Sequence, residues 1–379
     1  MRLPPLRRTY RALAFLWLNA CLGLLLLNLL ALALPPPLPA GPFEALAADA
    51  LRRVYPELGP DEVDALLRES ARELVYEPFT QFREKPGAGR HVNVDARGFR
   101  LTRGQGPWPP ESRFLNVLLF GGSTSFGYGV RDGDSVASYL QAELGALAPP
   151  RAPRVYNFGR GAYYSSQERV LFERLLAQGV RPDLAVFVDG LNDFFFYDDE
   201  PAWTAQLAES VAEARRAGAR PYVAALRALP LSRLIAARLP APDVRASMAP
   251  AAAPRTDDPA LAARVLERYF ANRRLIEAAA AAHGARSLFV WQPVPTYRYR
   301  APDGAPAQHY GRHEHSRAGY ARMAELRAAG RAGDLVWCAE LHGPGKGPLY
   351  VDQVHYSPEM SERLARCIAE GLRERGALR

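Results

Sequence analysis

The chain is almost devoid of lysine. Lys85 and Lys346 are its only lysines among 379 residues, so the formal net charge of +8 comes almost entirely from arginine. The arginines are spread along the sequence, and no stretch concentrates basic charge beside aromatic residues as a nucleic-acid groove requires. We therefore expect no nucleic-acid partner.

The sequence also lacks two phosphate-binding signatures and a residue spacing typical of metal ligands. The glycine-rich stretch FGGSTSFGYG at 120–129 is not followed by the lysine of a Walker loop, and the dinucleotide pattern GxGxxG is absent. The segment HYGRHEH contains His309, His313 and His315, but these lie in no strand or helix pattern that would fix them as ligands. We expect neither a cofactor nor a metal ion.

Cysteine is scarce, with three residues in the chain. Cys21 lies within an apolar run, which leaves Cys338 and Cys367 as the pair in the body of the protein. An oxidising compartment permits a disulfide between these two residues. Two separate buried thiols fit the sequence equally well.

A long apolar run occupies residues 12–34 and is interrupted by only two asparagines. Its length suffices to span a bilayer, and it exceeds the apolar core of a signal peptide. Arginines precede the run and acidic residues follow it, so the positive-inside rule places the N-terminus in the cytoplasm. Cleavage at the lipoprotein-like LNAC, 18–21, would leave a strongly apolar new N-terminus. We expect an uncleaved single-pass anchor in the cytoplasmic membrane, with the body periplasmic or extracellular.

The remaining pattern predicts the domain organisation. We expect a cytoplasmic tail at 1–11, a transmembrane helix at 12–34, a proline-rich spacer and helical lead-in at 35–112, and a main domain at 113–379. The stretch from Tyr76 to Arg100 reads as irregular. In the main domain, apolar strands alternate with helices, which predicts a parallel sheet covered on both faces. A helical insertion at about 194–284 follows the third strand, where a cap over the strand ends would lie.

Four polar segments fall where sites form in open parallel sheets, outside the carboxyl ends of the strands. GGSTSFG, NFGRGAYYSSQ and DGLNDF follow the first three strands, and YVDQVHYSP precedes the final helix. A serine in a strand-to-helix turn is a candidate nucleophile, but it needs a base. Ser123 is that serine, and His355 is the leading base because Asp352, three residues earlier, can orient its imidazole. Donors for an oxyanion are the Ser123 amide, the Asn192 side chain and the glycine-rich backbone at 159–162.

These four segments resemble, in order, the blocks of the SGNH/GDSL hydrolase superfamily. The resemblance implies a flavodoxin-like three-layer α/β/α sandwich. It also implies Ser123 as nucleophile, Asp352 and His355 as its triad partners, and an oxyanion hole of Ser123, Gly161 and Asn192. Two residues depart from the pattern: Gly122 replaces the aspartate of the nucleophile block, and the usual glycine of the second block falls on Ala162, with Gly161 one place earlier.

The resulting hypothesis is a membrane-anchored serine esterase that cleaves an acyl ester through an acyl-serine intermediate, with an acylated envelope carbohydrate as one candidate substrate. One alternative is a carbohydrate O-acyltransferase, for which the aromatic segments at 162–164 and 194–197 would suit a sugar chain, although packing explains aromatics at strand ends equally well. The other alternative is a catalytically silent binding module on the same fold.

Overall fold

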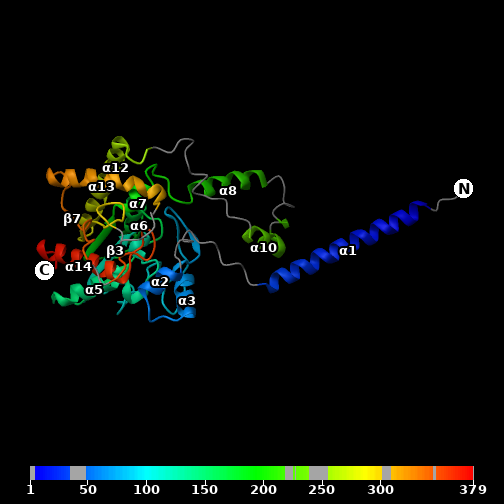
Figure 1. Cartoon of the computed structure of the whole chain (residues 1–379), viewed down its shortest axis with the longest axis horizontal. Helices are drawn as coiled ribbons and strands as arrows, with labels where there is room; N and C mark the ends of the chain where they lie inside the picture. Colours follow the sequence, from blue (N-terminus) through cyan, green and yellow to red (C-terminus); the bar gives the residue numbers. More distant parts are fainter. Residues whose placement is uncertain are drawn as a thin grey trace. The chain divides into compact units, whose positions relative to one another are not determined.

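The structure is a computed structural model that describes residues 5–34, 48–217, 225, 226, 228–238, 255–300, 309–344 and 347–378. The spacer at 35–42 and most of the Pro/Ala tract at 238–260 lie outside these residues. The chain forms two compact units (Figure 1): Met1–Gly41 with Trp203–Ala251, and Pro42–Ala202 with Ala252–Arg379.

The first unit contains three described helices. They are α1 (Pro5–Ala33), α8 (Thr204–Ala217) and α10 (Pro230–Arg238). The Thr9–Ala33 segment of α1 is long and apolar enough to cross a membrane. Within this unit α1 contacts α10, where the Asn28 side chain accepts a hydrogen bond of 2.9 Å from the Leu231 amide.

The second unit is built on a five-stranded parallel sheet. Its strands are β3 (Leu115–Gly121), β4 (Pro153–Asn157), β5 (Leu184–Asp189), β6 (Arg286–Trp291) and β7 (Leu335–Trp337). Their order is β4-β3-β5-β6-β7, and each neighbouring pair is parallel. Counted from the first strand of this sheet, the order is 2-1-3-4-5, the flavodoxin-like order. The predicted fold class is confirmed.

Helices cover both faces of the sheet (Figure 1). Helices α5 (Val136–Ala146) and α14 (Pro358–Glu374) pack on one face through a cluster of aliphatic side chains that includes Val117, Val186 and Val290. The other face carries α6 (Ser165–Ala177), α12 (Pro259–Ala282) and α13 (His315–Ala328). The result is a three-layer α/β/α sandwich.

The alternation of side chains along the strands separates the two layers. Phe120, Phe187 and Phe289 are direct cross-strand partners on β3, β5 and β6. Their rings stack with centroids 4.8 and 5.5 Å apart, and Phe172 of α6 meets two of them edge-on. These aromatic rings fill the face opposite the aliphatic cluster, so the strands are buried on both sides.

Helix α12 differs from the expectation that residues 194–284 form a cap. It packs against α6, α13 and β6, and nine of its side chains, among them Val265, Tyr269 and Ile276, are buried. Because β5 and β6 are parallel, the chain must cross back over the sheet between them, and α12 is that crossover. The last part of the expected insertion therefore belongs to the sandwich.

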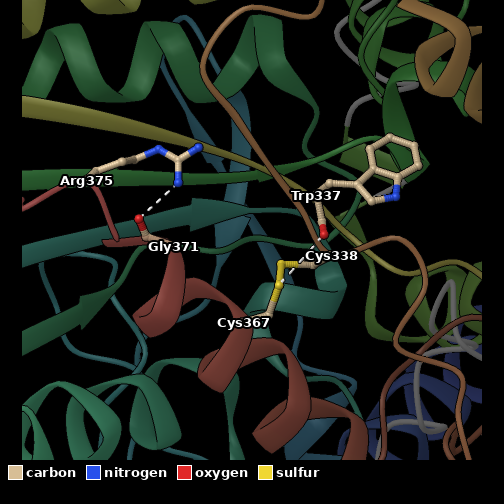
Figure 2. Close-up of a disulfide and its surroundings, with 5 residues drawn as sticks. All are labelled: Trp337, Cys338, Cys367, Gly371 and Arg375. Atoms are coloured by element: carbon tan, nitrogen blue, oxygen red, sulfur yellow. Dashed lines mark hydrogen bonds between the residues drawn. A yellow bond between two sulfur atoms is a disulfide. The ribbon is translucent and has the colours of Figure 1, made fainter. Parts of the chain in front are cut away.

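A disulfide joins Cys338 and Cys367 (Figure 2). Cys338 directly follows β7, and Cys367 lies on α14. The sequence left two alternatives open, a disulfide and two separate buried thiols, and the structure has the disulfide. The bond fastens the edge strand of the sheet to the helix that covers it.

The lead-in belongs to the same compact unit as the sheet. It consists of α2 (Ala48–Val54), α3 (Pro60–Ser70) and an antiparallel hairpin of β1 (Leu74–Glu77) and β2 (Gln81–Glu84). The prediction of irregular structure from Tyr76 onward is therefore wrong for the hairpin. Four-residue strands with no clear apolar alternation give little sequence signal. Side chains of α2 and α3 form a core cluster with Phe126 and Tyr128.

Candidate active site

Loops at one edge of the sheet carry the predicted site residues. Ser123 follows β3 and is the first residue of the short helix α4 (Ser123–Phe126). Asn192 lies just after β5, and Asp352 and His355 lie in the loop before α14. The carboxyl ends of parallel strands meet at the same edge, and the structure brings these four residues together there.

Ser123, His355 and Asp352 form a continuous hydrogen-bonded chain. The Nε2 atom of His355 lies 2.8 Å from the Ser123 Oγ, and its Nδ1 atom lies 2.6 Å from Oδ2 of Asp352. The other Asp352 oxygen accepts hydrogen bonds from the amides of Val354 (2.8 Å) and His355 (2.7 Å). An ionised Asp352 requires the imidazole proton on Nδ1, which leaves Nε2 to accept the serine proton.

The environment of Asp352 keeps it ionised. Burial by itself raises the pKa of this carboxyl, but the nearby His355 and the hydrogen bonds from His355 and Val354 outweigh burial and hold the pKa below the usual 3.8. Ser123 and His355 are also buried, with 7% and 4% of their surface exposed. Asp352 therefore has the charge that is needed to orient the ring and to stabilise its protonated form.

The turn at Ser123 is built by its glycines. The Phe126 amide donates to the Gly122 carbonyl (3.0 Å) and the Gly127 amide to the Ser123 carbonyl (2.9 Å), which closes the single helical turn of α4. Gly127 ends this turn with φ 93°, in the left-handed region that favours glycine. The serine side chain is thus held at the start of a rigid strand-to-helix turn.

Asn192 lies beside this turn, in α7 (Leu191–Phe195). Its Nδ2 atom donates a 2.7 Å hydrogen bond to the Tyr163 carbonyl. A side-chain amide has two hydrogens, so one donor remains. A Cβ atom added at Gly122 would collide with Asn192 Nδ2, which shows how closely the amide approaches the residue before Ser123.

The structure differs from the expectation at Gly161. The Gly161 amide donates to the buried Glu84 carboxylate at 2.6 Å and is not available to a substrate. The adjacent Ala162 has φ 59°, a backbone conformation typical of glycine, and none of the hydrogen bonds in the described part of the chain is donated by its amide. Of the two residues at this position, Ala162 is the one with an uncommitted amide.

A sequence model of the GDSL-like lipase/acylhydrolase family matches residues 119–363, which include all four blocks. The chain belongs to this family. Members of the family are hydrolases that act on esters, and the SGNH/GDSL resemblance seen in the sequence is confirmed. No curated protein matches the chain.

Several solved structures are similar to the chain at low sequence identity. TesA shares 18% identity, with 68% of this chain and 98% of TesA covered and a TM-score of 0.37. Est24, a carbohydrate acetylesterase from Sinorhizobium meliloti, shares 14% (68% and 98% covered, TM-score 0.36). The psychrotrophic esterase EstA from Pseudoalteromonas sp. shares 13% (69% and 97% covered, TM-score 0.36).

The surroundings of Gly122 explain one departure of this chain from the family pattern. The nucleophile block of the family has an aspartate at the position of Gly122. Because glycine has no Cβ, it leaves room for Asn192 and for the Tyr163 carbonyl, whose oxygen would lie 3.1 Å from a Cβ at position 122. Glycine at this position is therefore matched to the position of Asn192.

A residue outside the family match also contacts the loop that follows Ser123, and no sequence motif marks it. Buried Arg100 donates to the carbonyls of Phe126, Gly127 and Val130 and forms an ion pair with Asp132. It holds the chain that follows Ser123. A lone arginine in an irregular stretch carries no sequence signal of such a contact.

A group of buried carboxyls lies behind Asn192. Glu168 and Asp189 are at most 3% exposed, and burial raises the pKa of each well above its usual value; for Glu168 the neighbouring Asp189 adds to the rise. Asp193 is buried beside them and accepts a 2.6 Å hydrogen bond from the Ser165 hydroxyl. Burial therefore disfavours the ionised forms of Glu168 and Asp189.

The histidine-rich segment forms no ligand cluster. His313 contacts the Phe195 ring, and His315 begins α13 and contacts the Tyr197 ring. Among the residues that the structure describes, no group of three His, Cys, Asp or Glu side chains could hold a metal ion. His313 and His315 thus contact aromatic rings at the end of α7 and just after it.

Proposed function

We propose that the chain is a membrane-anchored serine esterase with Ser123 as nucleophile, His355 as general base and Asp352 as the residue that orients the base. The observation that carries this proposal is the 2.8 Å contact between Ser123 Oγ and His355 Nε2, continued by the 2.6 Å contact to Asp352. General-base catalysis requires hydrogen-bond reach between base and nucleophile, and both distances lie in that range.

The reaction proceeds in two halves. Ser123 Oγ attacks the acyl carbonyl while His355 Nε2 takes the serine proton; the tetrahedral intermediate collapses as Nε2 returns this proton to the leaving alcohol. Water then attacks the acyl-serine in the same manner, with His355 again as base, and releases the acid. Asp352 remains ionised throughout and stabilises the imidazolium in both halves.

The oxyanion of each intermediate is bound by three donors in this proposal. They are the Ser123 amide, the Asn192 side-chain amide and the Ala162 amide, which replaces the expected Gly161. Each donor acts where negative charge develops, and removal of one such donor costs about 3 kcal/mol of transition-state stabilisation.

Water is the proposed acceptor of the acyl group. A sugar acceptor would be favoured by exposed aromatic rings near the site, but Tyr163, Tyr164, Phe194 and Phe196 are at most 3% exposed. The other two aromatic residues of these segments, Phe195 and Tyr197, are half-buried, and their rings contact His313 and His315. Most of the aromatic rings at 162–164 and 194–197 therefore pack inside the protein, which favours water over a sugar as the acceptor.

The proposed location is the outer side of the cytoplasmic membrane. In this proposal residues 12–34, of which all but the last lie in α1, form the membrane span. The arginine-rich tail remains in the cytoplasm, and residues 113–379 form the hydrolase domain. The Cys338–Cys367 disulfide supports an oxidising compartment for the body.

Hydrolysis of p-nitrophenyl acetate by the detergent-solubilised full chain tests the activity. Ser123→Ala should abolish release of p-nitrophenol. Ser125→Ala is the matched control, because Ser125 lies on the same turn, is buried, and its hydroxyl has no hydrogen-bond partner among the residues that the structure describes. Undiminished hydrolysis by the Ser123→Ala variant would refute the proposed mechanism.

A further inference from the structure

The hairpin of β1 and β2 precedes the residues that the family model matches, yet it contacts the glycine-rich segment NFGRGAYYSSQ after β4, hereafter called the glycine block. We propose that Glu84, at the end of β2, is a positioning residue that holds the Ala162 amide in place for the oxyanion. This inference rests on the proposed esterase activity and adds a role for a part of the chain outside the hydrolase family match.

Glu84 binds two elements of the site with a single oxygen. Its Oε1 atom accepts a 2.6 Å hydrogen bond from the Gly161 amide and a 2.9 Å hydrogen bond from the Tyr128 hydroxyl. The side chain is only 2% exposed. A buried acceptor in this position fixes the Arg160–Gly161 peptide, which precedes the peptide that carries the Ala162 amide, because the Gly161 amide can turn away only by losing its buried hydrogen bond.

The hairpin binds the glycine block on both sides of Ala162. Glu77 of β1 forms an ion pair with Arg160, which is 1% exposed. The Tyr163 hydroxyl donates to the Phe82 carbonyl at 2.5 Å. The residue before Gly161 and the residue after Ala162 are thus bound to the same hairpin.

These contacts with the hairpin account for the backbone conformation of Ala162. A non-glycine residue at φ 59° is in a region that L-amino acids disfavour, and such conformations persist when the surroundings over-determine them. Of the contacts described, the one from Glu84 acts on the residue directly before Ala162. Loss of the Glu84 acceptor should therefore release Ala162 to a more ordinary conformation and withdraw its amide from the oxyanion.

The Tyr128 hydroxyl extends the effect of Glu84 toward the base. The Tyr128 ring lies 5.5 Å, centroid to centroid, from the His355 imidazole. Glu84 therefore joins the oxyanion loop to the residue that packs on the general base. A contact of this kind favours catalysis through geometry and leaves ground-state substrate binding largely unaffected.

The experiment compares Glu84→Leu, Glu84→Gln and Leu66→Ala in the full chain with p-nitrophenyl acetate. Glu84→Leu removes the acceptor, whereas Glu84→Gln keeps an oxygen for the Gly161 amide. Leu66→Ala is the control for destabilisation, since Leu66 is a fully buried apolar residue of the lead-in with no polar bond to the glycine block. If Glu84→Leu does not fold, Glu84→Asp, which withdraws the carboxylate by one methylene, takes its place.

We expect Glu84→Leu to lower kcat at least about 10-fold with KM changed less than about 3-fold. The reason is that a misplaced Ala162 amide stabilises the oxyanion poorly, so the fall in kcat approaches the fall caused by removal of one oxyanion donor. Glu84→Gln should keep kcat within about 3-fold of the parent chain, and Leu66→Ala should do the same at a reduced melting temperature. Equal kcat for Glu84→Leu and the parent chain would overturn the proposal, as would equal loss in Glu84→Gln and Glu84→Leu.

Hydrogen exchange of the amides at 159–163, followed by mass spectrometry, separates this inference from the proposed function. Faster exchange in Glu84→Leu than in the parent chain and Glu84→Gln supports the positioning role. Equal exchange in all three overturns it. If the parent chain hydrolyses no ester, the proposed function fails, and the exchange result still decides whether Glu84 holds the loop.

Discussion

The Nε2 atom of His355 lies 2.8 Å from the Oγ atom of Ser123 although 232 residues separate the two in the chain. The sheet explains this proximity. Ser123 follows β3, and the loop that carries His355 returns to the same edge before α14. Each residue is buried and hydrogen-bonded before any substrate arrives, so the proposed nucleophile and base are pre-organised.

Asp352→Asn should lower kcat by about 10²- to 10⁴-fold with little change in KM. The asparagine cannot stabilise an imidazolium, and its amide favours the wrong tautomer of His355. Asp183→Asn is the control, because Asp183 is held by Arg151 and the Asn116 amide just before β5, at the opposite end of the strands. Steady-state hydrolysis of p-nitrophenyl acetate gives both constants; an Asp352→Asn variant as active as Asp183→Asn would contradict the role of Asp352.

Asn192→Ala should lower kcat by about 10²- to 10³-fold, the usual cost of one oxyanion donor. Asn116→Ala is a matched control: Asn116 is 2% exposed and likewise donates from Nδ2 to a backbone carbonyl, that of Glu111 at 2.8 Å, but it lies at the start of β3. Both variants lose a buried amide, so a comparable fall in kcat for the two would show that Asn192 acts only on stability.

The sequence was sufficient for the features that a local pattern encodes. Buried strands such as β3 are continuous apolar runs between helical segments, so the parallel sheet and its two covered faces follow from hydrophobic patterning. The residues at the strand ends, Ser123 and Asn192, stand in short motifs. His355 was found because Asp352, its partner, lies three residues away.

Contacts made across the chain could not be predicted in the same way. The choice between Gly161 and Ala162 depends on which amide is already bonded, and Glu84, the acceptor, lies 77 residues upstream in a four-residue strand. No motif or periodicity marks Glu84. The function of α12 was missed for a related reason, since a crossover helix and a capping helix have the same apolar spacing in sequence.

The stability of Glu168→Gln should depend on pH less than that of the parent chain. Folding raises the pKa of Glu168 above 4.5, so the carboxyl contributes stability below pH 4.5 that is lost as pH rises toward its folded pKa. Glutamine does not ionise in the unfolded chain. The unfolding free energy of the variant relative to the parent should therefore increase as the pH rises from 4.5 toward the folded pKa of Glu168. Denaturant unfolding followed by tryptophan fluorescence measures this difference, and parallel pH curves would contradict the raised pKa of Glu168.

The disulfide predicts the number of free thiols in the chain. The denatured, unreduced protein should contain one free thiol, from Cys21, and three after reduction. Replacement of both Cys338 and Cys367 by serine should lower the unfolding free energy by about 3 to 4 kcal/mol, because the bond closes a chain segment with a separation of 29 residues. Three free thiols before reduction would contradict the pairing and remove its support for an oxidising location.

Covalent labelling with a fluorophosphonate tests the central claim most directly, because it needs no knowledge of the natural substrate. Incubation of the detergent-solubilised full chain, followed by peptide mass spectrometry, should place one phosphonyl group on Ser123. The label should be absent from Ser123→Ala and present in Ser125→Ala. An unlabelled Ser123 in the folded chain, or a label on another serine that persists in Ser123→Ala, would contradict the account.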